Sequence, residues 1–189
     1  MLLIAVCALA LLSPLAVGRW PAGVLLRRWR LTPLVWLALA VQVVMVQAAL
    51  PEPVAKGLHL ATYVVAFVFL WANRAVRGVL VVGAGALSNG VTIALNGGSL
   101  PASPRAVELA GLDHGEGFSN SAVLADPVLP WLGDVFAWPA PLPLANTFSV
   151  GDVLIAVGVA IAAWSGTARL GRTPAESGPE ADPRPSVQA

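Results

Sequence analysis

The sequence predicts an all-α integral membrane protein with about five transmembrane helices and a Pro/Gly-rich extracytoplasmic loop between the fourth and fifth helices. Three observations lead to this prediction. Hydrophobic residues make up 57% of the 189 residues and charged residues only 11%, against roughly 25% charged in typical soluble domains. Several long apolar stretches carry no charge, as membrane-spanning helices do. Arginines collect in alternate connections between those stretches, as the positive-inside bias requires.

Five apolar stretches have the length of candidate spans. At about 1.5 Å per residue each would be roughly 25–29 Å long, close to the thickness of a hydrocarbon core of about 30 Å. The candidate spans are residues 1–17, 33–50, 57–73, 78–96 and 148–166. The first looks like a signal peptide but has no basic segment at its start and no Ala-x-Ala-like site before Arg19, so we expect it to be retained.

The charged residues predict the orientation. The 18–32 connection carries four arginines and no acid, the turn after the third span carries two arginines, and the stretch after the fifth span opens with two more. The 97–147 loop has one arginine against five acidic residues. With the basic segments in the cytoplasm, the N-terminus lies outside, the 97–147 loop is the outer loop and the C-terminus is cytoplasmic. The excess of arginine over lysine, ten to one, is typical of a GC-rich bacterial genome, so the expected location is the bacterial inner membrane.

Residues 1–170 therefore form a single multi-pass membrane domain. Within it, the 18–32 segment "GRWPAGVLLRRWRLT" mixes apolar residues with arginines, which fits a short helix in the inner headgroup region and equally an irregular basic loop. The tail, residues 171–189, holds four prolines and no aromatic residue. It cannot bury enough apolar surface to offset the loss of chain entropy, so we expect it to be disordered in the cytoplasm.

The fourth and fifth spans carry small and polar residues. Asn89 and its neighbours Ser88 and Thr92 lie in the fourth span, and glycine and alanine recur at four-residue intervals in the fifth. Small residues at this spacing let two helices approach closely, and amide or hydroxyl groups can bond across the interface. We expect the two spans to pack together, with the polar residues either joining the helices or forming a site.

The outer loop is longer than a passive linker requires. Ser103, Pro104 and Gly111 are typical of the start and end of a short helix. The proline-rich segment 126–148 cannot be a regular helix or a central strand, and we expect it to fold back over the helix ends. Its aromatic residues and nearby amides are candidate ligand-binding residues, which with Asn89 make the following set: Asn89, Asn96, Asn120, Trp131 and Trp138.

One carboxylate, Asp152, stands at the start of the fifth span. Ser149 and Asp152 match the Ser-x-x-Asp capping box, in which each side chain bonds the other residue's backbone amide. The alternative is a polar cluster of Asp152 with Asp134, Asn96 and Asn120 at the outer surface, because acids at membrane depth tend to mark sites. Asp134 and Asp152 are accordingly the candidate catalytic residues. The sequence indicates no metal site, no cofactor and no nucleic-acid partner; the expected partners are membrane lipids and another membrane protein.

Two resemblances follow from short motifs. The stretches "ALNGGSLP", "FSNS", "LPWLGDVFAWP" and "NTFSVGDVLIAVG" resemble a bacterial family of multi-pass membrane proteins whose domain has no assigned function. More weakly, "GAGALSNG" and "NTFSVGDVLIAVG" resemble motifs of the lipoprotein signal peptidases, which implies that Asp152 is one of two catalytic aspartates. Where the second aspartate should stand this chain has Thr92, so Asp134 would have to substitute by another route.

Three functions remain open on the sequence. The leading hypothesis is a non-enzymatic scaffold or binding module whose outer surface engages a lipid, a ligand or a protein partner. The alternative is an intramembrane aspartyl-type hydrolase using Asp134 and Asp152. A small transporter comes third, because only Ser88, Asn89 and Gly90 offer polar groups in the middle of a span.

Overall fold

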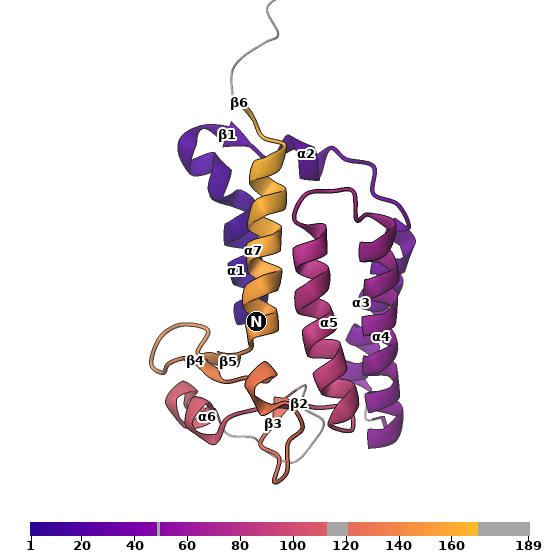
Figure 1. Ribbon diagram of the computed structural model, residues 1–189, viewed down its shortest axis with the longest axis vertical. Helices are drawn as coiled ribbons and strands as arrows, with labels where there is room; N and C mark the ends of the chain where they lie inside the picture. Colours follow the sequence, from indigo (N-terminus) through magenta and orange to yellow (C-terminus); the bar gives the residue numbers. More distant parts are fainter. Residues whose placement is uncertain (49, 113–120, 170–189) are drawn as a thin grey trace, which may run out of the picture.

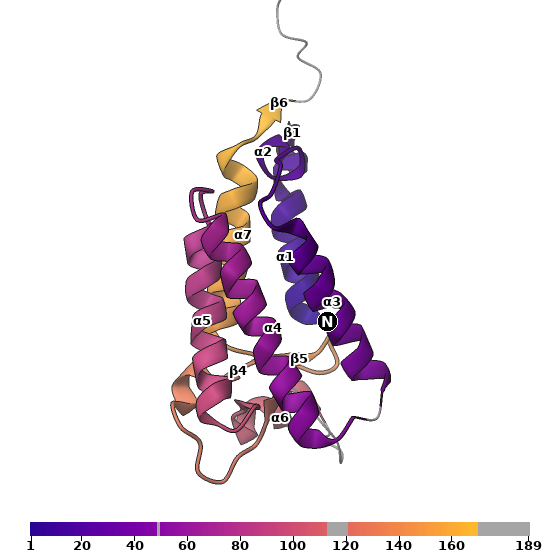
Figure 2. The same ribbon diagram turned by 90° about the vertical axis from the view of Figure 1, so that its right-hand side faces the viewer.

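The chain is mostly helical, as predicted. The computed structural model describes residues 1–48, 50–112 and 121–169, and its long helices run side by side along the long axis of the molecule (Figures 1 and 2). In chain order they are α1 (Leu2–Leu12, continued by a 3-10 turn, Ser13–Val17), α3 (Thr32–Gln47), α4 (Glu52–Ala72), α5 (Val79–Leu95) and α7 (Val150–Ser165). The predicted tail, residues 171–189, lies outside the described residues, and so does Asn120.

The five long helices coincide with the five predicted apolar stretches, with differences at their ends. α4 begins at Glu52, five residues before the predicted start, because Pro53 occupies the first helical turn, where its missing amide costs nothing. α3 ends at Gln47, three residues early. Between α4 and α5 the chain reverses in a short turn that ends at Gly78, whose φ of 87° suits glycine.

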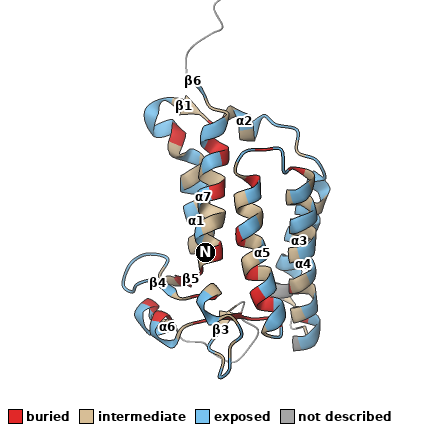
Figure 3. Cartoon of the chain, in the orientation of Figure 1, coloured by how far each residue is buried: buried red, intermediate tan, exposed pale blue. Residues whose placement is uncertain are grey.

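The helices pack in a defined order. α5 lies between α4 and α7, α1 packs on the other side of α7, and α3 packs on α4. Buried residues gather along α5 and α7, whereas α3 and α4 expose residues along their length (Figure 3). Many of the exposed side chains are large and apolar; Val64 and Leu80, for example, are 64% and 60% exposed.

One of these helices, at Pro53–Ala72, is both long and apolar enough to cross a membrane by itself. The other apolar helices are shorter: Leu2–Val17, Thr32–Val44, Val79–Leu95 and Val150–Ser165. The five predicted crossings therefore stay a prediction at the four shorter helices.

The all-α prediction is wrong for the connections, which contain three two-stranded sheets. β1 (Arg19–Trp20) pairs antiparallel with β6 (Ala168–Arg169), β2 (Leu100–Pro101) pairs parallel with β3 (Ser121–Ala122), and β4 (Phe136–Trp138) pairs antiparallel with β5 (Asn146–Phe148). The prolines between β4 and β5 exclude a helix there, but strands of two or three residues need few ladder hydrogen bonds and tolerate prolines at their ends.

The segment 18–32 contains the predicted short helix, reduced to one turn, α2 (Ala22–Leu25). The Gly23 amide donates to the Gly166 carbonyl (2.7 Å), which fixes α2 at the C-terminal end of α7. Further along, the Arg30 backbone exchanges two hydrogen bonds with the Asn73 side chain in the α4–α5 turn (3.0 and 2.9 Å). The three arginine-bearing segments therefore meet at one end of the helices, the upper end in Figure 1.

The loop between α5 and α7 covers the opposite end (Figure 1). Its helix α6 (Pro104–Ala110) follows Ser103 and ends at Gly111, whose φ is 63°, as predicted. Ser103 makes no side-chain capping bond, however. α6 packs against β4 and β5, and a 3-10 turn, Pro130–Leu132, contacts α5. We call the described part of this loop, residues 97–112 and 121–148, the cap.

Candidate functional site

Glycines bring α5 and α7 into close contact. A Cβ atom on Gly85 would meet the carbonyl oxygen of Gly151, and one on Gly78 would meet that of Gly158. Seven residues separate the two glycines on each helix, so the same contact repeats along the antiparallel pair. This is the close packing through small residues that the sequence predicted for the fourth and fifth spans.

A ring of hydrogen bonds closes this interface at its cap end. Asn89 Nδ2 donates to Asp152 Oδ1 (2.9 Å), and Ser149 Oγ donates to Asn89 Oδ1 (2.9 Å). The Ser149 amide donates to Asp152 Oδ2 (3.1 Å), and the Asp152 amide donates to Ser149 Oγ (3.0 Å). Asn89 is only 3% exposed and Ser149 is fully buried. We call these three residues the polar ring.

The polar ring confirms the capping box. Ser149 and Asp152 each bond the other's backbone amide, and the carboxylate lies in the first turn of α7, where the helix dipole favours negative charge. Its second oxygen accepts from Asn89, on the neighbouring helix. Asp152 therefore caps α7 and joins α7 to α5 at once.

Asp134 holds the cap together. Its side chain is 6% exposed, and its Oδ2 accepts a hydrogen bond from Thr147 Oγ1 (3.1 Å). Its backbone amide donates to the Pro101 carbonyl (2.8 Å), and its own carbonyl accepts from the Ser103 amide (3.0 Å). One residue thus connects β2, the start of α6 and β5.

The two candidate catalytic acids approach a common neighbour. Tyr63, on α4, lies near enough to both Asp152 and Asp134 for their charges to act on its hydroxyl group. The ring of Tyr63 packs against Gly90 of α5, where an added Cβ would be 3.1 Å from the ring. Thr92, which stands where the signal-peptidase resemblance would require an aspartate, is fully buried and donates to the Ser88 carbonyl (2.8 Å).

Asn96 does not join Asp152 in the predicted cluster. Its Nδ2 donates to the carbonyls of Thr92 (2.7 Å) and Val128 (2.8 Å), and its Oδ1 accepts from the Val128 amide (2.8 Å). Asn96 therefore fastens the cap to the C-terminal end of α5. The prediction that Asn96 lies with Asp152 is wrong because the amide is already engaged by the backbone at Val128.

The candidate tryptophans point away from the polar ring. Trp131 is 63% exposed and Trp138 is 42% exposed. Trp138 Nε1 donates to the Pro143 carbonyl (3.0 Å), so its indole is held within the cap. Beside it, Phe136 stacks on Phe148 with ring centroids 5.3 Å apart. The cap therefore presents fixed aromatic side chains on its outer surface.

The described residues contain no group of three histidine, cysteine, aspartate or glutamate side chains close enough to hold a metal ion. The polar ring offers hydrogen-bonding groups, but its printed bonds join its members to one another. Chemically it can fix the geometry of two helices, and it places one carboxylate near the cap.

Sequence reasoning missed two partners, Ser149 as a bridge to Asn89 and Thr147 as the donor to Asp134. The register of α5 and α7 contains the signal. Because Gly85 faces Gly151, moving four residues along each antiparallel chain sets Asn89 opposite the segment 147–149.

Comparison with known proteins now identifies the family. A model of the family of unknown function DUF5317 matches residues 24–164. The chain belongs to this family. An uncharacterized protein of Thermotoga maritima is 33% identical to the chain over 102 residues, which are 53% of this chain and 58% of that protein. The DUF5317 chain thus spans little more than half the length of this relative. No solved structure matches it.

Proposed function

We propose that this DUF5317 protein is a bacterial inner-membrane protein with five crossings, whose cap is a binding module that engages membrane lipid at the outer surface. The observation that carries the proposal is a division of labour in the cap. The polar candidates bond within the protein, whereas Trp131 and Trp138 are held rigidly with their rings exposed.

The surface of the helices supports the membrane location. Exposed apolar side chains such as Leu37, Val64 and Leu80 would form patches larger than soluble monomers usually tolerate. In a bilayer the same side chains contact lipid tails at no cost. The arginines of three separate segments meet at one end of the helices, as cytoplasmic segments do in the positive-inside arrangement.

The build of the cap supports the lipid-binding role. Tryptophan prefers the headgroup zone because its ring is apolar and its N–H can hydrogen-bond. Asn96 and Asp134 fasten the cap to α5 and to itself, so the exposed rings are pre-organised. Little ordering entropy then remains to be lost on binding.

The proposal is tested by a photo-crosslinking amino acid placed at Trp131, with the same amino acid at Arg105 on the exposed side of α6 as the control. In native membranes we expect lipid adducts at position 131 at several times the yield at position 105. Adducts to a protein at 131 would replace lipid by another membrane protein as the partner. Equal, low yields at both positions would refute the cap as a binding surface.

A second candidate function is the intramembrane aspartyl hydrolase, and the shared neighbour Tyr63 is the observation that favours it. Two nearby carboxylates can hold one proton between them and work as acid and base. Against this, Asp152 is bonded on both oxygens as a cap and bridge. The hydrolase predicts that Asp134→Asn and Asp152→Asn each abolish cleavage of a lipoprotein precursor in membranes, whereas the binding module predicts no such loss.

A further inference from the structure

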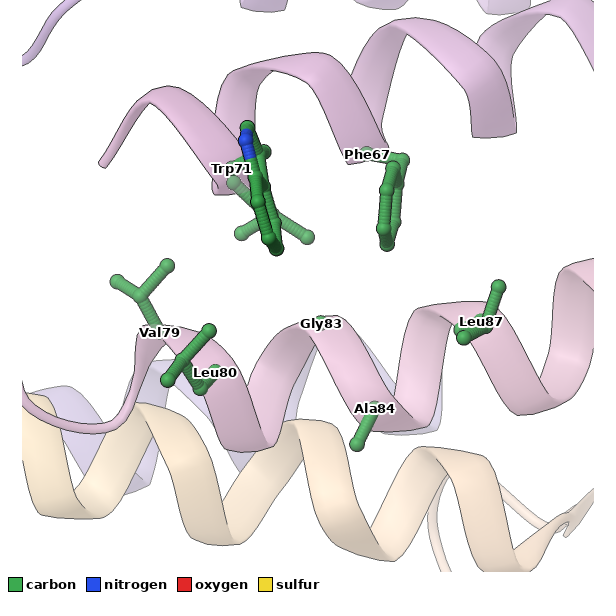
Figure 4. Close-up of a pocket in the computed structure, with 8 residues that line it drawn as sticks. Phe67, Trp71, Val79, Leu80, Gly83, Ala84 and Leu87 are labelled. Carbon is green, nitrogen blue, oxygen red and sulfur yellow. The ribbon is translucent and has the colours of Figure 1, made fainter. Parts of the chain in front are cut away.

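An apolar groove lies between α4 and α5 on the side away from the cap. Phe67 and Trp71 of α4 face α5 across it (Figure 4). The cavity measures about 220 Å³, and it is lined only by apolar side chains and one glycine: Phe67, Leu70, Trp71, Val79, Leu80, Gly83, Ala84 and Leu87.

The groove exists because α5 carries a very small residue opposite the two aromatic rings. A Cβ atom on Gly83 would meet nothing within 4 Å. This distinguishes Gly83 from Gly85, whose missing side chain is filled by α7. Gly83 therefore does not serve close helix packing, and the space beside it is open.

Arginines stand at the mouth of the groove. Arg74 lies over the Trp71 ring, 4.8 Å from its centroid, and its Nη1 donates to the Trp71 carbonyl (2.9 Å). Arg77, three residues on, is exposed in the same turn. The Arg30 backbone is bonded to Asn73 beside them. The guanidinium of Arg74 thus keeps several of its five N–H donors for an anion.

No acidic residue balances this charge at the same end. The acidic residues of the described chain lie at the cap end or in the cap: Glu52, Glu108, Asp126, Asp134 and Asp152. An apolar slot topped by unbalanced arginines is complementary to a molecule with an apolar chain and a phosphate.

We infer that this groove is a binding site for an anionic phospholipid of the inner leaflet, with one acyl chain between Phe67, Trp71 and Gly83 and the phosphodiester on Arg74 and Arg77. Basic pockets between transmembrane helices on the cytoplasmic side bind such headgroups. A second copy of the chain fits less well, because copies sharing one orientation would bring the same arginines together. The inference rests on the proposed membrane location but not on the role of the cap.

The test is native mass spectrometry of the purified full chain in detergent with equal amounts of phosphatidylglycerol and phosphatidylcholine. We expect phosphatidylglycerol adducts to dominate. The double variant Arg74→Gln/Arg77→Gln should bind phosphatidylglycerol about 25-fold more weakly, from about fivefold per arginine. Arg27→Gln/Arg28→Gln, which removes two exposed arginines outside the turn, is the matched control and should change binding less than threefold.

The groove is tested separately by Gly83→Leu, which fills it and should abolish the adduct with the headgroup arginines intact. Gly57→Leu is its control, since a Cβ on Gly57 also meets nothing within 4 Å. Adducts that survive Gly83→Leu, equal retention of the two lipids, or a dimer in place of a lipid adduct would each overturn the inference. If the wild-type chain resists carbonate extraction yet retains no phosphatidylglycerol, this inference falls alone; a chain released by carbonate would overturn the membrane location as well.

Discussion

The polar ring makes a quantitative prediction about stability. In Asn89→Ala, Asp152 loses its cross-helix donor and the Ser149 hydroxyl loses its acceptor. A hydrogen bond to a charged group contributes about 1.5–3 kcal/mol and a neutral one about 0.5–1.5 kcal/mol. The pair is thus worth about 2–4.5 kcal/mol. Bonds between helices in lipid average only about 0.6 kcal/mol each, which lowers the expected loss to the lower part of this range, about 2 kcal/mol.

The assay is equilibrium unfolding of the purified chain in mixed micelles, followed by circular dichroism. The matched control is Ser88→Ala, one residue earlier on α5. Ser88 Oγ is buried and has no hydrogen-bond partner among the described residues, so its removal should change the free energy of unfolding by less than about 0.5 kcal/mol.

A double-mutant cycle then isolates the bond itself. Asn89→Ala and Asp152→Ala should lose less together than the sum of their separate losses, with a coupling of about 0.5–2 kcal/mol. A loss for Asn89→Ala no greater than that for Ser88→Ala, or strictly additive losses in the cycle, would refute the view that the ring joins α5 to α7.

Two further predictions concern packing and the cap. Gly85→Ala places a Cβ against the backbone of Gly151 and should destabilise the chain by about 2–4 kcal/mol through overpacking, whereas Gly83→Ala enters open space and should be neutral or stabilising by up to about 1 kcal/mol because alanine favours helix; thermal melts of the two variants compare them, and similar melting temperatures would contradict the assigned interface. Thr147→Val keeps the shape of the side chain but removes the donor to buried Asp134, so hydrogen exchange in the β4–β5 hairpin should accelerate with α5 unaffected; unchanged exchange in the hairpin would show that the bond does not hold the cap.

The positions of the helices could be predicted from the sequence because they depend on local patterns. Uninterrupted apolar stretches gave all five long helices, and Ser149 and Asp152, three residues apart, gave the capping box. Gly111 ended α6 as predicted, at a positive φ that glycine adopts without strain.

The pairing of polar groups could not be predicted in the same way. Asn89 bonds a residue 63 positions later, and this partner depends on the register of two helices, which glycine contacts fix. Asn96 bonds the backbone at Val128, and a backbone partner leaves no trace in side-chain composition. The short strands of the connections were missed for a similar reason, because each consists of two or three residues whose partner is distant in sequence.

The measurement that tests the account most directly is cysteine accessibility in intact bacterial cells. Cys7, the single cysteine of the chain, is first replaced by serine, and then Arg105→Cys in α6 and Ala75→Cys in the α4–α5 turn are made separately; both native residues are exposed. With a membrane-impermeant maleimide, the account predicts that Arg105→Cys reacts in intact cells and that Ala75→Cys reacts only after lysis. Reaction at both positions only after lysis, or the reverse order, would contradict the outward-facing cap.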